Sequence, residues 1–309
     1  MRIVVTEFMD ADAVARLAAA HDTHYAQDLV DRPAELAAAA ADADARLGRN
    51  RTEVGGALLD ACRRLRVVGR LGVGLDNIDV PACAARGIEV VPATGANALA
   101  VAEYVIATAM ALLRGAYASS ADVADGRWPR AVLSAGREIA GKTLGLVGFG
   151  DIGRTTARLA TALGMRIVGH DAVLPPADAA WREARAEPLA LDELVARADV
   201  VSLHVPLTAA TRGLIGASRI AAMRPGAVLV NTSRGGIVDE TALAAALRSG
   251  HLGGAALDVF EHEPLPAGSP LAGAPRLLLT PHIAGLTLES NMRVSTMIAD
   301  RVLAFLARS

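Results

Sequence analysis

The chain of 309 residues lacks the features that mark several classes of protein. Its only two cysteines, Cys62 and Cys83, lie outside any CxxC or CxxH pattern, so we expect free thiols and neither a disulfide framework nor a metal site. The formal net charge is −2 with acids and bases interspersed, which argues against a nucleic-acid or anionic-membrane surface. The most apolar segment, residues 98–113, is interrupted by Glu103 and is shorter than the ~20 residues that cross a bilayer. No signal-peptide pattern follows Met1, so we expect a cytoplasmic protein.

Strand-like and helix-like segments alternate along the chain, which is typical of parallel sheets with helices on both faces. The predicted strands cover residues 3–6, 23–26, 45–47, 66–71, 144–147, 166–169, 200–204, 227–231, 254–259 and 277–280. The predicted helices cover residues 11–20, 33–41, 54–62, 98–115, 154–163, 191–198, 240–249 and 289–306. The sequence therefore predicts an α/β protein with two doubly wound parallel sheets.

A glycine-rich turn follows the strand at 144–147. It has the pattern Gly148-Phe149-Gly150-Asp151-Ile152-Gly153, in which Gly148 permits the turn, Gly150 admits a pyrophosphate and Gly153 lets helix pack on strand. The following strand ends at Asp171, where a carboxylate can bind an adenosine ribose and repel a 2′-phosphate. These residues predict a dinucleotide site that prefers NAD to NADP.

A second glycine-rich turn, Leu71-Gly72-Val73-Gly74, follows the strand that contains Arg70. Successive backbone N–H groups after a strand can bind an anion, so we expect this turn to hold a carboxylate; a plain strand-to-helix turn is the alternative. Arg51 lies in the loop after the preceding strand. We expect Arg51 and Arg70 to face the cleft where the substrate is held, or else to be surface charges.

Five motifs together resemble the D-isomer-specific 2-hydroxyacid dehydrogenases. They are the glycine-rich turn 148–153, Val205-Pro206-Leu207-Thr208, Asn231 to Gly236, Asp258 to Pro264, and Pro281-His282-Ile283-Ala284-Gly285. Within that family the chain is similar to the phosphoglycerate dehydrogenase branch, and residues 7–10, 49–52, 69–79 and 128–130 are similar to bacterial sulfolactate dehydrogenases.

The resemblance implies a Rossmann-type NAD domain, residues 98–285, inserted in a flavodoxin-like substrate domain formed by residues 1–97 and 286–309. It also implies that Asp258 binds the nicotinamide carboxamide, that Thr232 and Ser233 line the pocket of the nicotinamide ring, and that Thr211 lies on the adenine side. His204, Val205, Pro206 and Gly285 are expected to line the same cofactor.

The chemistry of a 2-oxo acid assigns roles to three residues at strand ends. Arg234 has a planar fork that can hold a carboxylate and polarise the carbonyl oxygen. His282 carries an imidazole, which can donate or accept the proton. Glu263 would favour the charged imidazole and fix its orientation. Because Arg51 and Arg70 are surplus for a simple 2-oxo acid, we expect a three-carbon dianion, with sulfolactate ahead of 3-phosphoglycerate.

Several alternatives remain open at this stage. The segment 122–130, with Gly126, Trp128 and Pro129, is either an arm against a second subunit of a homodimer or a surface loop. The chain stops at Ser309, so we expect no regulatory domain and no feedback by serine. Three other functions are alternatives to a dehydrogenase of a dianionic acid: a glyoxylate or hydroxypyruvate reductase, a formate dehydrogenase-like enzyme, and a non-catalytic NAD-sensing scaffold. The formate dehydrogenase-like enzyme is disfavoured, because resemblance to that group implies a glutamine in place of Glu263.

Overall fold

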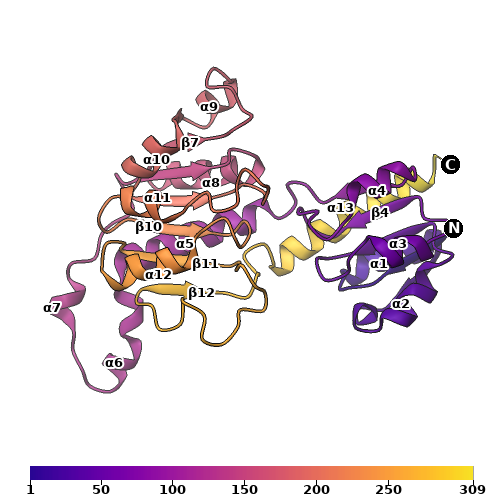
Figure 1. The fold of residues 1–309 in the computed structure, drawn as a ribbon, viewed down its shortest axis with the longest axis horizontal. Coiled ribbons are helices and arrows are strands. Elements are labelled where there is room, and N and C mark those ends of the chain that lie inside the picture. Colours follow the sequence, from indigo (N-terminus) through magenta and orange to yellow (C-terminus); the bar gives the residue numbers. More distant parts are fainter. Residues whose placement is uncertain (309) are drawn as a thin grey trace. The chain divides into compact units, whose positions relative to one another are not determined.

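The computed structural model describes residues 1–308 (Figure 1). The chain divides into two compact units, of which the first is Met1–Asn97 together with the chain from Leu286 onward. The second unit is the continuous segment Ala98–Gly285. Both units are α/β and each contains one fully parallel sheet, so the predicted fold class is confirmed.

The first unit is built on a five-stranded sheet with the order β2-β1-β3-β4-β5. Its strands are β1 (Arg2–Val5), β2 (Asp22–Tyr25), β3 (Ala45–Gly48), β4 (Val67–Arg70) and β5 (Glu89–Pro92). Its helices are α1 (Ala11–Ala20), α2 (Pro33–Ala40), α3 (Gly56–Ala61), α4 (Val80–Ala85) and α13 (Leu288–Leu306), with the 3-10 turn η1 (Leu29–Asp31). This flavodoxin-like order has its topological switch point between β1 and β3, where ligands of such sheets bind.

Helices cover both faces of this sheet. On one face α1 and α13 pack against β1, β3 and β4, and Leu17 and Ile298 belong to the buried cluster there. Gly69 of β4 makes room for α13, because a Cβ at that position would lie 2.7 Å from Cγ2 of Ile298. The other face is covered by α2, α3 and α4.

The second unit is built on a seven-stranded sheet with the order β12-β11-β10-β9-β6-β7-β8. Its strands are β6 (Thr143–Val147), β7 (Arg166–His170), β8 (Ala186–Pro188), β9 (Val200–Leu203), β10 (Val228–Asn231), β11 (Gly254–Leu257) and β12 (Leu277–Leu279). Its helices are α5 (Ala98–Arg114), α6 (Ser120–Ala124), α7 (Arg130–Leu133), α8 (Asp151–Ala162), α9 (Ala179–Glu183), α10 (Leu191–Arg197), α11 (Ala217–Ala222) and α12 (Glu240–Arg248), with the 3-10 turn η2 (Ala116–Ser119). The order on either side of β6 and β9 is that of a dinucleotide-binding Rossmann sheet, with the switch point between those two strands.

The core of the second unit lies on both faces of its sheet (Figure 1). Apolar residues of α5 and α8 form one cluster with β6 and β10. Those of α10, α11 and α12 form the other. The segment that holds α6 and α7 extends away from the sheet in Figure 1. Among the described helices, no single one is long and apolar enough to cross a membrane, and α5 reaches that length and composition only jointly with residues 116–124, across a bend of 65°.

Seven short helices and strands differ from the sequence prediction, which did not include α4, α6, α7, α9, α11, β5 or β8. Of these, α9 supplies a large side chain to the core, because Trp181 stacks on Phe149 of the glycine-rich turn with the ring centroids 4.1 Å apart. The indole Nε1 donates to the carbonyl oxygen of Pro175 at 3.0 Å. Gly169 of β7 lies directly under the ring, since a Cβ there would be 2.4 Å from Cζ3.

We expect Trp181→Ala to lower the free energy of unfolding by about 3–5 kcal/mol, because it leaves a cavity under α9 and removes the stacking on Phe149. An exposed apolar residue between β7 and α9 serves as the control. Trp181 is 3% exposed and Val173 is 89% exposed, so Val173→Ala should change the free energy by less than about 0.5 kcal/mol. Urea denaturation followed by circular dichroism measures both. Similar small losses in the two variants would contradict a structural role for α9.

Candidate active site

All seven strands of the second unit run parallel, so the residues that follow them meet at one edge of the sheet. The loops after the neighbouring strands β12, β11 and β10 carry His282, Glu263 and Arg234 respectively. Further along the same edge come His204 after β9, the glycine-rich turn after β6 and Asp171 after β7. The topology thus gathers most of the predicted residues of this unit along one line.

His282 and Glu263 are in direct contact. Nδ1 of His282 lies 2.8 Å from Oε2 of Glu263, and both side chains are partly exposed. The other oxygen of Glu263, Oε1, accepts the backbone N–H of Phe260 at 3.0 Å, which fixes the carboxylate. A carboxylate on Nδ1 selects the tautomer that carries hydrogen there and leaves Nε2 as the ring nitrogen that can exchange a proton with a ligand.

Asp258 holds the segment that carries His282. Its buried carboxylate accepts three hydrogen bonds, from the hydroxyl of Thr280 at 2.6 Å and from the backbone N–H groups of Ile283 at 2.8 Å and Ala284 at 2.7 Å. His282 itself has a φ of 58°, and its N–H donates to the carbonyl oxygen of Asp258 at 2.9 Å. The contact of Asp258 with a nicotinamide carboxamide stays a prediction.

The loop after β10 is shaped by Asn231. Its side chain accepts from the N–H of Ser233 and donates to the carbonyl of Arg234, each at 3.0 Å. The hydroxyl of Ser233 donates to the carbonyl of Leu203 at 2.6 Å, which ties the loop to β9. Gly235 packs against the next loop, because a Cβ there would be only 1.7 Å from the carbonyl oxygen of Phe260. The loops of Arg234 and Glu263 are therefore in contact without room for a methyl group.

The three glycines of the turn after β6 have different surroundings. A Cβ on Gly148, whose φ is +96°, would lie 2.3 Å from the carbonyl oxygen of His204, and a Cβ on Gly153 would lie 2.3 Å from that of Gly148. A Cβ on Gly150 would meet nothing within 4 Å. The first and third glycines thus serve close packing within the protein, whereas the second faces open space at the N-terminus of α8. A pyrophosphate fits there, beside the unbonded N–H groups of the first helical turn.

Asp171 is fixed by backbone donors. Its oxygens accept the N–H groups of Phe149 at 2.8 Å, Val173 at 2.9 Å and Leu174 at 3.0 Å. Burial raises the pKa of this carboxyl, but the three hydrogen bonds outweigh it and hold the pKa below its usual value of 3.8. Asp171 is therefore charged at neutral pH and placed beside the glycine-rich turn, as a ribose-binding carboxylate has to be.

Two buried polar atoms in this part of the unit have no hydrogen-bond partner among the described residues, Nδ1 of His204 and Oγ1 of Thr232. Burial lowers the pKa of His204 to about 4, so its ring is neutral at pH 7 and bonds through Nε2 to Ser202 at 3.0 Å. Both orphaned atoms follow strands next to the switch point, where a dinucleotide can satisfy them. The residues present therefore fit NAD.

The other predicted cofactor residues lie along the same edge. The hydroxyl of Thr211 donates to the carbonyl of Pro206 at 2.6 Å and accepts the N–H of Thr208 at 2.8 Å, so it shapes its own turn. Asp151 forms an ion pair with Arg154 at 3.0 Å. Ile152 is in the first turn of α8, Val205 follows His204, and Gly285 follows His282. Their contacts with a cofactor stay predictions.

The predicted substrate residues are in the first unit. Arg51 is 58% exposed and its guanidinium pairs with Asp31 of η1. Arg70 is buried, its Nε donates to the carbonyl oxygen of Gly74 at 2.8 Å, and its Nη1 would lie 2.5 Å from a Cβ on Gly72. The guanidinium of Arg70 therefore packs inside the turn Leu71-Gly72-Val73-Gly74, whereas that of Arg51 reaches the surface.

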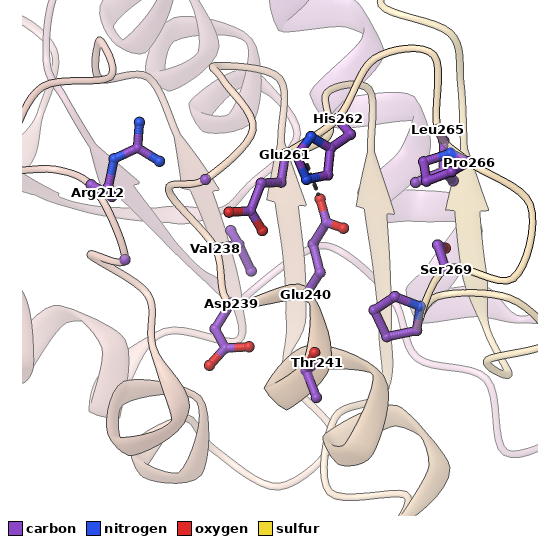
Figure 2. A pocket seen from close by; sticks show the side chains of 13 residues that line it. Arg212, Val238, Asp239, Glu240, Thr241, Glu261, His262, Leu265, Pro266 and Ser269 are labelled. Carbon is purple, nitrogen blue, oxygen red and sulfur yellow. Dashed lines mark hydrogen bonds between the residues drawn. The ribbon is translucent and has the colours of Figure 1, made fainter.

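The second unit has a hollow of about 480 Å³, and none of the predicted site residues lines it. Figure 2 shows the side chains around it. Its polar side chains are those of Arg212, Asp239, Glu240, Thr241, Glu261, His262 and Ser269. Glu240 accepts the N–H of Glu261 at 2.8 Å, so this wall supports the loop that leads to Glu263. Among the described residues, no group of three or more His, Cys, Asp or Glu side chains is arranged to hold a metal ion.

Comparison with known proteins agrees with this geometry. Residues 106–284 match the model of the D-isomer specific 2-hydroxyacid dehydrogenase, NAD binding domain. A protein of Chromohalobacter salexigens named (S)-sulfolactate dehydrogenase is 53% identical over 301 residues, which are 97% of this chain and 96% of that protein. A D-3-phosphoglycerate dehydrogenase of Mycobacterium tuberculosis is 43% identical over 273 residues, 88% of this chain but only 51% of that protein.

Among solved structures, the TT0316 protein from Thermus thermophilus superposes with a TM-score of 0.88 at 36% identity and covers 99% of this chain and 97% of its own. The family model spans more than half of the chain, and the relative from C. salexigens matches nearly all of it. The chain belongs to the D-isomer-specific 2-hydroxyacid dehydrogenase family and is an NAD-dependent oxidoreductase that acts on 2-hydroxy acids.

Proposed function

We propose that the substrate is a three-carbon 2-hydroxy acid with a second anionic group, sulfolactate ahead of 3-phosphoglycerate, and that Arg234, Glu263 and His282 carry the reaction. The contact of 2.8 Å between His282 and Glu263, beside the loop of Arg234, is the observation that supports the catalytic assignment. In this proposal the first unit is the substrate domain and the second is the NAD domain.

Each residue has a separate task in the reduction of the 2-oxo acid. The fork of Arg234 binds the substrate carboxylate and the carbonyl oxygen in one plane, which polarises the carbonyl. Nε2 of His282 donates a proton to the developing alkoxide, and the carboxylate of Glu263 on Nδ1 stabilises the imidazolium that is ready to donate. NAD, when bound, supplies the hydride acceptor and NADH the hydride donor.

We expect His282→Ala to lower kcat by about 10²–10⁴-fold, because the proton donor is lost. The affinity for NADH should change little, since the imidazole contacts the substrate oxygen in this proposal. Steady-state rates and a fluorescence titration of NADH measure the two quantities. His262→Ala is the matched control, because His262 is exposed and lines the hollow of Figure 2, and its rates should equal those of the unchanged protein.

The Glu263→Gln variant should retain part of the activity. As the pH rises, it should lose the reduction of the 2-oxo acid at a lower pH than the unchanged protein does. The carboxylate favours the protonated imidazole, and a neutral amide does not, so the imidazolium needed for reduction disappears earlier as the pH rises. The pH dependence of kcat/KM for reduction, measured from pH 5 to 9, tests this. A profile identical to that of the unchanged protein would remove Glu263 from proton transfer.

The second anion is assigned to Arg51 rather than Arg70. The guanidinium of Arg70 is buried and bonded to the glycine turn, so its proposed task is to hold that turn in shape. The ion pair of Arg51 with Asp31 is exposed, and exposed pairs are weak enough to open for a ligand. An arginine fork suits a sulfonate or a phosphate. The name of the C. salexigens relative supports sulfolactate as the preferred substrate.

We expect Arg51→Ala to raise KM for sulfopyruvate by about 10–100-fold, because a charged hydrogen bond to the second anion is lost, and to leave KM for glyoxylate nearly unchanged. Arg63→Ala supplies the control, since Arg63 is an exposed arginine of the same unit. Initial rates of NADH oxidation give both constants. Equal increases in KM for the two substrates would show that Arg51 does not bind the second anionic group.

One panel of assays tests the whole assignment. The purified protein receives NADH with pyruvate, glyoxylate, hydroxypyruvate, phosphohydroxypyruvate or sulfopyruvate, and loss of NADH absorbance is followed. The proposal requires the highest kcat/KM with one of the two dianions. A higher value for glyoxylate or hydroxypyruvate would overturn the substrate, and no oxidation with any acid would point to a non-catalytic NAD-binding protein.

We further propose that the protein acts as a homodimer in the cytoplasm. The segment that holds α6 and α7 exposes Tyr117, Trp128 and Val132 and surrounds a hollow of about 340 Å³, so it offers an apolar surface to a second copy. The free thiols of Cys62 and Cys83 suit a reducing compartment. Light scattering of the purified protein gives the molar mass that decides the oligomeric state.

A further inference from the structure

A buried carboxylate lies at the switch point of the first unit. Glu7 is the second residue after β1 and is 4% exposed. Its Oε1 accepts three donors, the N–H of Arg49 at 2.8 Å, the N–H of Thr52 at 3.0 Å and the hydroxyl of Thr52 at 2.8 Å. Its Oε2 accepts the N–H of Arg51 at 3.3 Å. One side chain thus binds the backbone of the loop 49–52 at three of its four residues.

The carbonyl groups of the same loop are bound by Asn77, which lies three residues after the glycine-rich turn 71–74. Nδ2 of Asn77 donates to the carbonyl oxygens of Arg49 at 2.8 Å and of Thr52 at 2.7 Å. Glu7 binds backbone N–H groups and Asn77 binds backbone carbonyl groups, so the two side chains together fix both ends of the loop 49–52. The side chains of Asn50 and Arg51 are exposed, and they project from a backbone that is fixed on either side of them.

A buried cation is linked to this network through two threonine hydroxyls. Arg46 of β3 is 1% exposed, and its Nη2 donates to the hydroxyl of Thr6 at 3.4 Å, which in turn lies 3.0 Å from the hydroxyl of Thr52. Burial lowers the pKa of Arg46 to about 10, against the opposing effects of Cys62, Glu7 and Cys83, so the guanidinium is charged at pH 7. Arg46 and Glu7 thus compensate each other's charge in the interior.

We propose that Glu7 is a positioning residue for substrate preference, which acts by fixing the backbone of Arg51 so that its guanidinium is presented to the second anion of the substrate. This inference rests on the proposed role of Arg51. A carboxylate is required, since all four groups that face Glu7 are donors and both oxygens are used. An amide of the same shape can accept at only one of the two positions.

The test is Glu7→Gln. If its oxygen keeps the three donors at Oε1, the amide NH2 faces the N–H of Arg51, and the backbone of that residue is released. We expect KM for sulfopyruvate to rise about tenfold, with kcat for sulfopyruvate and both constants for glyoxylate unchanged. The matched control is Glu53→Gln, an exposed carboxylate of the same segment, which should leave all constants unchanged. Equal changes for both substrates, or no change for either, would overturn the inference.

The coupling of Glu7 to Arg51 separates this inference from the proposal on which it rests. In the Arg51→Ala background, Glu7→Gln should have no further effect on KM for sulfopyruvate. If Arg51→Ala does not alter the preference for the dianion, the substrate proposal fails. If Arg51→Ala alters it and Glu7→Gln does not, or if the two effects multiply, only the positioning role fails.

Glu7→Gln leaves the charge of Arg46 buried without its counterpart, so the variant has a risk of misfolding. A second variant, Glu7→Gln with Arg46→Met, removes both buried charges together. It should fold and show the same rise in KM for sulfopyruvate, with a melting temperature closer to that of the unchanged protein. A folded double variant with unchanged preference for the dianion would overturn the inference as well.

Discussion

The carboxylate of Asp258 joins the ends of two strands, and the arrangement of the proposed catalytic pair depends on it. It is buried at the end of β11 and takes three hydrogen bonds from residues 280–284, which follow β12. A buried carboxylate that accepts several donors holds its partners more firmly than neutral groups do. Because Glu263 is in the loop that follows Asp258, the same carboxylate anchors the segment of His282 to the start of the loop that carries Glu263. Tyr104 of α5 extends the network, since its hydroxyl lies 2.7 Å from that of Thr280.

Much of this arrangement could be predicted from the sequence because it follows from local patterns. The helix predicted at 11–20 is α1 with the same bounds, since its apolar spacing and the capping side chain of Asp10 are local signals. The apolar run before Gly148 predicted β6, and the turn that follows leads into α8. Parallel strands present their carboxyl ends at one edge, so Arg234, Glu263 and His282 could be expected together although 48 positions separate the first from the last.

The parts that could not be predicted depend on contacts between distant segments. The strand β8 has three residues and ends in Pro188, so it lacks a recognisable period. Helix α9 has five residues, and its importance comes from the stacking of Trp181 on Phe149, which are 32 positions apart. The bonds of Glu7 reach across 42 to 45 positions to Arg49 and Thr52. The burial of Arg46 is equally hidden, since an arginine in a short strand is read as exposed until its neighbours are known.

The place of α13 in the chain has a consequence for synthesis on the ribosome. Val294, Ile298 and Val302 of α13 cover the face of the first sheet that is formed by β1, β3 and β4. The ribosome synthesises β1 to β5 first, then the whole second unit, and only afterwards the residues of α13. The nascent first unit therefore carries an uncovered apolar face, with the notch at Gly69 unfilled, while residues 98–285 emerge and fold. The first unit completes its core after the second one, although its synthesis began earlier.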